Sequence, residues 1–180
     1  WSAGYGAVGQ ILRQPAGKKV DTLILLDSVY TGYKDDGKLS TYGLEPFVEF
    51  ARSAARGSKL MFQSFSSIIP PGYASTGEVA RYIVGELGGK MATAKRSDVL
   101  GLEMFERFDR RGYHSRGYRG EDKPDHCAHL GLMKDVLKIH LSRRWHTPRG
   151  RASEMVVAAA KVAARTKGTV HVVTKGDSLS

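Results

Sequence analysis

Apolar residues along the chain alternate between helical spacing and short continuous runs. Helical spacing occurs over residues 5–14 and 44–56, and Gly57 follows the second segment at the position typical of a helix end. Each segment is followed by a short apolar run, at residues 20–26 and 59–64. A run of this length between a helix and a polar loop predicts a strand that is buried on both faces of a parallel sheet.

The pattern continues less regularly after the second run. Ser75 and Glu78 have the Ser-x-x-Glu spacing of a capping box, which predicts a helix that extends to about Leu87. Residues 98–110 are apolar at intervals and residues 113–118 have an extended character. Together these two segments predict one further strand.

A loop that turns into a helix is predicted after Glu121. Asp125 has the residue type of a helix N-cap, so His126 is expected in the loop just before the helix and His129 one turn into it. The helix itself is indicated by residues at helical spacing, namely Leu130, Met133, Val136, Leu137 and His140.

This alternation of helices and buried strands predicts an α/β fold with a three-layer, mostly parallel, doubly wound sheet. We expect this domain to occupy residues 1–146. A basic break with proline and glycine begins at residue 147, so residues 147–168, which include an alanine-rich stretch, are expected to form a linker. Residues 169–180 are then expected to begin a second domain.

The composition narrows the class of protein without choosing a function. The chain has 180 residues, of which 41% are apolar and 26% charged, and this balance is typical of a globular domain. No apolar run approaches the roughly 20 residues of a membrane helix, so no transmembrane segment is expected. Cys127 is the only cysteine, which excludes a disulfide within the chain. The net charge of +10 favours anionic surroundings such as nucleic acid, acidic lipid or acidic cell-wall polymer.

The first residues hold a candidate nucleophile. Trp1-Ser2-Ala3-Gly4 has the form x-S-x-G, which is the nucleophile elbow G-x-S-x-G without its first glycine. We therefore expect a fragment whose N-terminal part is missing. In such an elbow the serine has a strained backbone and small neighbours, and Ala3 and Gly4 are small. A helix N-cap at Ser2 is the alternative explanation of the same pattern.

One aspartate and two histidines are candidate partners of this serine. Asp27 follows a predicted buried strand, at the edge where α/β folds build their sites, so it is a candidate to orient a histidine; capping of the following loop is the alternative. His126 is the preferred general base because a loop just before a helix can aim its ring, and His129 is the alternative base. With Asp125 and Cys127 these histidines also suggest zinc, but no His-Glu-x-x-His motif is present. We therefore expect no metal and no cofactor.

The order of Ser2, Asp27 and His126 along the chain resembles that of the α/β-hydrolase triad. Residues 1 to about 145 look like the C-terminal half of such a domain of bacterial type. The resemblance implies that Ser2 attacks an acyl carbonyl, that His126 takes and returns the proton, and that Asp27 holds the imidazole. It also implies that the backbone N–H of Ala3 supplies half of the oxyanion hole. In that family the acid more often follows the next strand, where this chain offers Ser64, Ser66 and Ser67.

The last residues resemble the opening of a LysM domain. Residues 170–173 predict a short strand, and an ordinary strand and turn is the alternative. The turn and the helix start that follow are Gly176, Asp177, Ser178 and Leu179. The resemblance implies that the complete domain binds peptidoglycan or another N-acetylglucosamine polymer.

Together these resemblances imply a serine hydrolase, an esterase or amidase, that acts on an acyl substrate. Its LysM module would hold it in the bacterial cell envelope, in a periplasmic or secreted location. The alternative is a catalytically inactive α/β domain that serves as a cell-wall-binding or scaffold module. Residues 110–120 alternate arginine with glycine and tyrosine, which also suits single-stranded nucleic acid. Because this stretch is short and unrepeated, we expect an ordinary strand and no nucleic-acid partner.

Overall fold

The structure is a computed structural model that describes residues 1–98 and 100–146. Contacts between residues separate a first unit, Trp1–Leu141, from the residues that begin at Ser142. The described part of the second unit is the short helix α6 (Ser142–His146). The expected linker and the LysM-like residues Gly176, Asp177, Ser178 and Leu179 lie outside the described residues. Within the described part of the chain, no helix has the length and apolar character needed to cross a membrane.

The first unit is built on a five-stranded sheet with the strand order β1-β2-β5-β4-β3. Three strands pair in parallel, namely β1 (Thr22–Leu26), β2 (Leu60–Ser66) and β5 (Tyr113–Tyr118). Two more continue the sheet in antiparallel pairing, β4 (Glu103–Arg110) against β5 and β3 (Ala92–Ser97) against β4. The fold is therefore of the α/β kind, as predicted.

The sheet is mixed, so the expectation of a mostly parallel sheet is wrong. The segments expected to supply one strand form two, β4 and β5, and β3 precedes them. Arg111 and Gly112 join β4 to β5. The φ angle of 50° at Arg111 suits a tight antiparallel hairpin, whose turn needs positive φ. The residues of the edge strand β3 are mostly exposed and polar, so no hydrophobic pattern predicts that strand.

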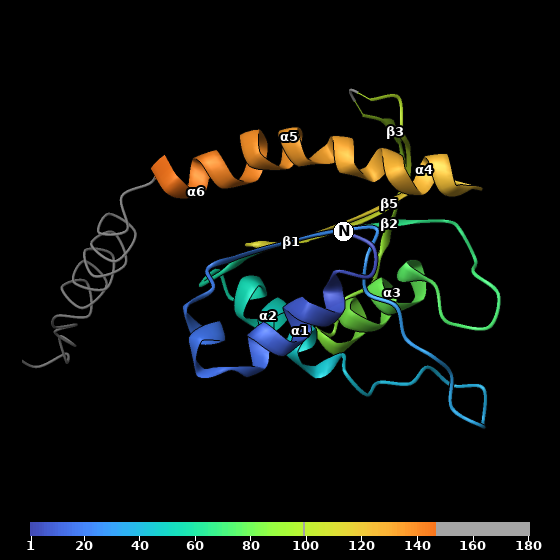
Figure 1. Ribbon diagram of the computed structural model, residues 1–180. Helices are drawn as coiled ribbons and strands as arrows, with labels where there is room; N and C mark the ends of the chain where they lie inside the picture. Colours follow the sequence, from blue (N-terminus) through green and yellow to red (C-terminus); the bar gives the residue numbers. More distant parts are fainter. Residues whose placement is uncertain (99, 147–180) are drawn as a thin grey trace, which may run out of the picture. The chain divides into compact units, whose positions relative to one another are not determined.

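Three helices cover one face of the sheet (Figure 1), namely α1 (Tyr5–Arg13), α2 (Glu45–Ala55) and α3 (Thr76–Glu86). Ser75 and Glu78 form the predicted capping box at the start of α3. The core on this face joins side chains of β1, β2 and β5 to those of α2 and α3, including Leu23, Leu25, Phe47, Met61, Ile83 and Tyr113. Val8 and Leu12 of α1 pack against its edge.

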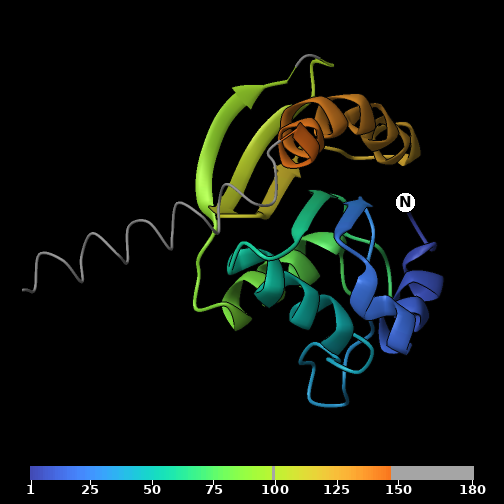
Figure 2. The same ribbon diagram turned by 90° about the vertical axis from the view of Figure 1, so that its left-hand side faces the viewer.

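A second helical layer lies on the opposite face (Figure 2). It consists of α4 (Lys123–Ala128), the 3₁₀ turn η2 (His129–Gly131), α5 (Leu132–Val136) and the π-helical turn η3 (Leu137–Leu141). Here Leu26 and Phe62 of the strands share a core with Leu132 and Val136. β1 is therefore buried on both faces, as its apolar run predicts.

The start of this layer differs from the prediction. α4 begins at Lys123, and its N-cap is Asp122, whose carboxylate accepts a hydrogen bond from Asp125 N–H at 3.1 Å. Asp125 is thus not the N-cap, and His126 lies on a helix rather than in a loop. Pro124 suits the early start because residues of the first helical turn have no intrahelical partner for an N–H.

The apolar residues of the same layer are only partly buried. Leu132, Val136 and Leu141 are buried. Leu130, Met133 and Leu137 remain 46%, 37% and 41% exposed. Helical spacing therefore predicted the helical segment and included the buried Val136, but it does not distinguish the buried apolar residues from the exposed ones.

Gly112 is a position at which the sheet has no room for a side chain. An added Cβ would overlap the carbonyl oxygen of Lys59 and would lie 3.1 Å from that of Ala54. Gly112 also donates its N–H to Ala54 and accepts a hydrogen bond from Met61 N–H, so its backbone is held on both sides. We expect Gly112→Ala to lower the free energy of unfolding by about 2 kcal/mol or more, measured by urea denaturation.

Gly85 provides a matched control for this substitution. It lies on the exposed side of α3, and no atom lies within 4 Å of an added Cβ. Gly85→Ala should raise the free energy of unfolding by about 0.5–1 kcal/mol, because alanine favours a helix. Equal effects of the two substitutions would contradict the packing argument.

Candidate active site

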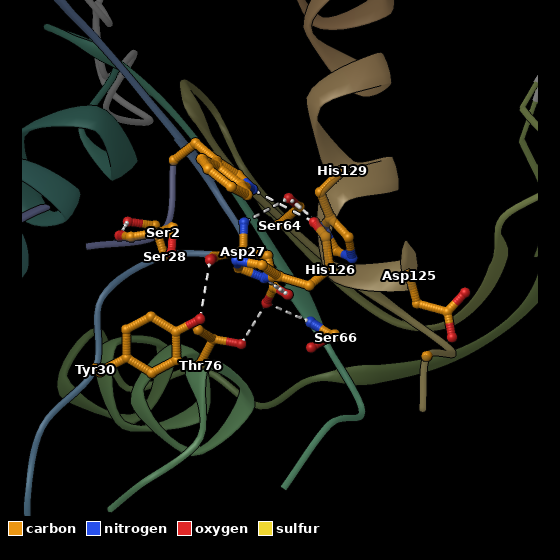
Figure 3. A network of polar contacts seen from close by, with 12 residues as sticks. Ser2, Asp27, Ser28, Tyr30, Ser64, Ser66, Thr76, Asp125, His126 and His129 are labelled. Carbon is orange, nitrogen blue, oxygen red and sulfur yellow. Dashed lines mark hydrogen bonds and ion pairs between the residues drawn. The ribbon is translucent and has the colours of Figure 1, made fainter. Parts of the chain in front are cut away.

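The candidate residues meet at the carboxyl ends of β1 and β2 (Figure 3). Asp27 directly follows β1, Ser66 ends β2, Thr76 begins α3, and His126 lies on α4. The Oδ1 atom of Asp27 accepts hydrogen bonds from Ser66 N–H at 2.8 Å and from the Thr76 hydroxyl at 2.6 Å. Its Oδ2 atom lies 2.7 Å from Nδ1 of His126. One carboxylate therefore links four elements of the fold.

Asp27 is 1% exposed and has a φ of 39°, an uncommon backbone conformation for a residue other than glycine. Burial acts to raise the pKa of its carboxyl. Electrostatic attraction to His129 and the three hydrogen bonds act in the opposite sense and prevail, so the pKa lies below its ordinary value of 3.8. Asp27 is thus ionised at neutral pH despite its burial.

His126 is held at one ring nitrogen and on one ring face. An ionised carboxylate only accepts hydrogen bonds, so Nδ1 carries a proton, and the lone pair of the neutral ring is then on Nε2. The Trp1 indole stacks on the imidazole with ring centroids 4.9 Å apart, and its Nε1 atom donates to the His126 carbonyl at 3.4 Å. The ring of His126 lines a pocket, so its basic nitrogen belongs to an accessible site.

Ser2 lies where the chain meets the sheet and turns into α1. It forms a parallel bridge with Ser28, whose hydroxyl donates to the Ser2 carbonyl at 2.8 Å. Its φ of 51° is a left-handed conformation, which costs a residue of this type about 1–3 kcal/mol. The N-cap of α1 is Gly4, so the alternative of Ser2 as the helix cap is wrong.

Ser2 and His126 share a pocket without a direct hydrogen bond. Within the described part of the chain, the Ser2 hydroxyl has no hydrogen-bond partner. Catalytic hydrogen bonds are often absent or long in unliganded sites and form when substrate binds. The structure thus joins Asp27 to His126 by contact, and brings Ser2 and Ala3 to the same pocket.

His129 lies close to this site but does not line its pocket. Its side chain is 1% exposed, and its Nδ1 lies 2.8 Å from the hydroxyl of Ser64. The other ring nitrogen is buried and has no partner within the described residues. Burial lowers the pKa of His129 below 6.5, an effect that outweighs the attraction of Asp27. This geometry favours His126, and not His129, as the general base.

The pocket has a volume of about 830 Å³ and is lined by residues from widely separated parts of the chain. Ser2, Asp27 and His126 are at its polar side. Tyr30, also in the lining, donates its hydroxyl to the Asp27 carbonyl at 3.4 Å, and burial raises the pKa of that phenol. Tyr30 therefore remains a protonated donor at neutral pH.

Sequence reasoning found Asp27 and His126 but not the groups that hold them. In the sequence, Thr76 is distinguished only by its position after the N-cap Ser75. Ser66 acts through its backbone N–H, which no pattern of side chains can predict. Trp1 was expected only as part of the elbow, and its stacking on His126 has no sequence signal. Of Ser64, Ser66 and Ser67, which the sequence offers at the end of the second strand, Ser66 lines the pocket.

The arginine-rich stretch considered for nucleic acid forms β5 and the turn before it. β5 lies between β2 and β4 and is hydrogen-bonded on both sides. Arg116 contacts Asp109 at 2.6 Å and donates to the carbonyls of Phe108 and Ser115. Within residues 1–98 and 100–146, no group of three or more histidine, cysteine, aspartate or glutamate side chains is placed to hold a metal ion.

Comparison of the chain with protein-family models, with curated proteins and with solved structures finds no match. The function of the site is therefore inferred from its own geometry.

The buried neutral His129 predicts a loss of stability in mild acid. An unfolded histidine has a pKa of about 6.5. Because the folded pKa of His129 is lower, the unfolded chain binds more protons as the pH falls below about 6.5, and unfolding becomes easier. We expect the free energy of unfolding to fall between pH 7 and pH 5, and His129→Asn to flatten this dependence, measured by urea denaturation at each pH.

Asp27 does not account for this window, because a carboxyl with a lowered pKa loses its stabilising effect only below about pH 4. The exposed His146 is the matched control. His146→Asn should leave the slope of stability against pH unchanged. A wild-type slope that persists in His129→Asn would show that another group titrates on unfolding.

Proposed function

We propose that this protein is a serine hydrolase, an esterase or amidase, with Ser2 as nucleophile, His126 as general base and Asp27 as the acid that orients it. The observation that supports this most is the 2.7 Å contact between Asp27 Oδ2 and His126 Nδ1. The carboxylate side chain is 1% exposed and the imidazole 16%. The acid is therefore buried, whereas the imidazole is partly accessible and lines the same pocket as Ser2.

The reaction follows from the roles of these atoms. The Ser2 oxygen attacks the carbonyl carbon of an ester or amide while its proton moves to Nε2 of His126. The carbonyl oxygen becomes an oxyanion, and the backbone N–H of Ala3, beside Ser2 in the pocket wall, is the proposed donor to it. The leaving group takes the proton from His126 as its bond to carbon breaks. Water then attacks the acyl-serine by the same proton route and releases the acid.

Asp27 acts by its charge and its position. Its lowered pKa keeps it ionised while His126 becomes positively charged, so the pair gains attraction as the proton arrives. Proton transfer on to Asp27 is not required. The hydrogen bonds from Ser66 and Thr76 fix the carboxylate so that only Oδ2 faces the imidazole.

The cellular setting that we propose rests on the sequence. Residues Gly176, Asp177, Ser178 and Leu179 resemble the opening of a LysM domain, which in its complete form binds N-acetylglucosamine polymers such as peptidoglycan. A net charge of +10 suits an anionic envelope. We therefore place the enzyme in the bacterial cell envelope, periplasmic or secreted, with its catalytic domain tethered to the wall.

Covalent labelling of the chain with a fluorophosphonate tests the nucleophile. We expect labelling of Ser2, loss of labelling in Ser2→Ala, and a fall in labelling rate on the order of 10⁴-fold in His126→Ala, because removing a triad member costs this much or more. Asp27→Asn should also slow labelling strongly, since the amide cannot orient the same imidazole tautomer. Mass spectrometry of the labelled peptide identifies the modified residue.

Ser58→Ala is the control, because Ser58 is exposed and outside the pocket. It should label at the wild-type rate. A folded wild-type chain that takes no label at Ser2 would reject the hydrolase and support the alternative, a catalytically inactive wall-binding or scaffold module.

A further inference from the structure

The pocket beside Ser2 has two walls of different chemistry. Asp27 and His126 form the polar wall together with Ser2. A second, apolar wall belongs to the segment between β2 and α3, which contributes Ile68, Ile69, Pro70, Pro71 and Tyr73 to the lining. Tyr30 joins this wall, with its ring edge-on to that of Tyr73 at 5.5 Å between centroids. The pocket thus has a reactive side and a continuous apolar side.

Part of the apolar wall is exposed to solvent. Ile69 is 82% exposed and Tyr73 is 43% exposed, and both border the pocket. Exposed apolar groups that gather at a pocket mark a binding surface more often than isolated ones do. Ile69 precedes two prolines, which restrict its backbone and their own, so this wall is stiff before any ligand binds. A stiff wall loses little entropy when it binds a ligand.

Several polar groups of the pocket are engaged within the protein. The Thr76 hydroxyl donates to Asp27, and the Tyr30 hydroxyl donates to the Asp27 carbonyl. Asp122 accepts the N–H of Asp125 as the cap of α4. The lining contains no asparagine, glutamine or arginine, and Lys123 at the start of α4 is its one lysine. A sugar ring buried against Ile68, Ile69, Pro70 and Pro71 would leave hydroxyls without partners, because these side chains carry no polar atom, and each such hydroxyl costs free energy.

We infer that this pocket takes the acyl part of the substrate, and that this part is a neutral aliphatic chain of several carbons. The inference rests on the proposed hydrolase function, since it places the chain by the carbonyl that Ser2 would attack. Ile68–Tyr73 is then the segment that determines acyl specificity. The alcohol or amine part of the substrate lies outside the pocket, where a polar polymer of the cell wall would be accommodated.

A series of p-nitrophenyl esters from acetate to octanoate, each kept below its micellar concentration, tests the inference. Burying one methylene group completely contributes about 0.8 kcal/mol, which is about a fourfold change in binding. A partly exposed wall buries only part of each methylene group, so the change per group is smaller. We expect kcat/KM to rise about twofold to fourfold per methylene until the pocket is filled. A profile that is flat or falls from acetate onward would overturn the inference.

Substitution of a residue in the apolar wall distinguishes an effect on acyl binding from an effect on the catalytic residues. Ile69→Ser should lower kcat/KM for the octanoate about fivefold and leave the acetate within about twofold of wild type, because acetate does not reach the wall. Ile11→Ser is the matched control, since Ile11 is 53% exposed on α1 and does not line this pocket. This substitution should change kcat/KM for neither ester. Equal losses on both esters in Ile69→Ser would show that the segment supports the site and does not select the acyl group.

The outcomes for the two proposals are distinct. Failure of the proposed function appears as an unlabelled Ser2 and as ester hydrolysis that persists in Ser2→Ala. Failure of the acyl inference appears in a chain whose Ser2 is labelled and whose hydrolysis depends on Ser2, but whose rate does not increase with chain length.

Discussion

The hydrogen bond between Asp27 and His126 is the constraint on which the site depends. A carboxylate that is 1% exposed is stable only if its charge is compensated. Here Ser66 N–H, the Thr76 hydroxyl and His126 Nδ1 supply that compensation. Each donor comes from a different element, so the ends of β1 and β2, the start of α3 and the middle of α4 must all be in place before the charge is satisfied. A displacement of any one of these elements therefore removes a hydrogen bond from Asp27 and destabilises the whole site.

The parallel pairing of β1 and β2 explains why these groups meet. Parallel strands end at the same edge, and the residues that follow them are brought together without a long loop. The chain then accepts local strain at that edge, with positive φ at Ser2, Asp27 and Val29. Each such residue costs about 1–3 kcal/mol, and the burial of Val29 and Leu26 beside them is the kind of packing that offsets it. Strain gathered around candidate catalytic residues is what a preorganised site requires.

The sequence predicted the parts of the fold that have a one-dimensional signature. The apolar run before Asp27, the helical spacing of 44–56 and the capping box at Ser75 each correspond to an element of the structure. The antiparallel half of the sheet was not predicted, for two reasons. β3 is polar and exposed, so it has no hydrophobic pattern. The turn at Arg111 needs a positive φ, which an arginine in the sequence does not indicate. At the site, the end of a predicted strand pointed to Asp27, whereas His126 was chosen from an expected loop and in fact lies on α4. The donors that fix them, a backbone N–H and a threonine hydroxyl, depend on three-dimensional placement and leave no pattern along the chain.

The two histidines show how environment assigns a role that spacing leaves open. His126 and His129 lie one turn apart, and both rings come within the electrostatic reach of Asp27. His129 turns into the protein, where burial favours its neutral form and the Ser64 hydroxyl occupies Nδ1. His126 lies at the pocket wall, where Asp27 holds Nδ1 and Nε2 keeps its lone pair. A general base needs both a fixed orientation and access to the substrate. His129 has only the first of these, whereas His126 is held by the carboxylate at one ring nitrogen and also lines the pocket.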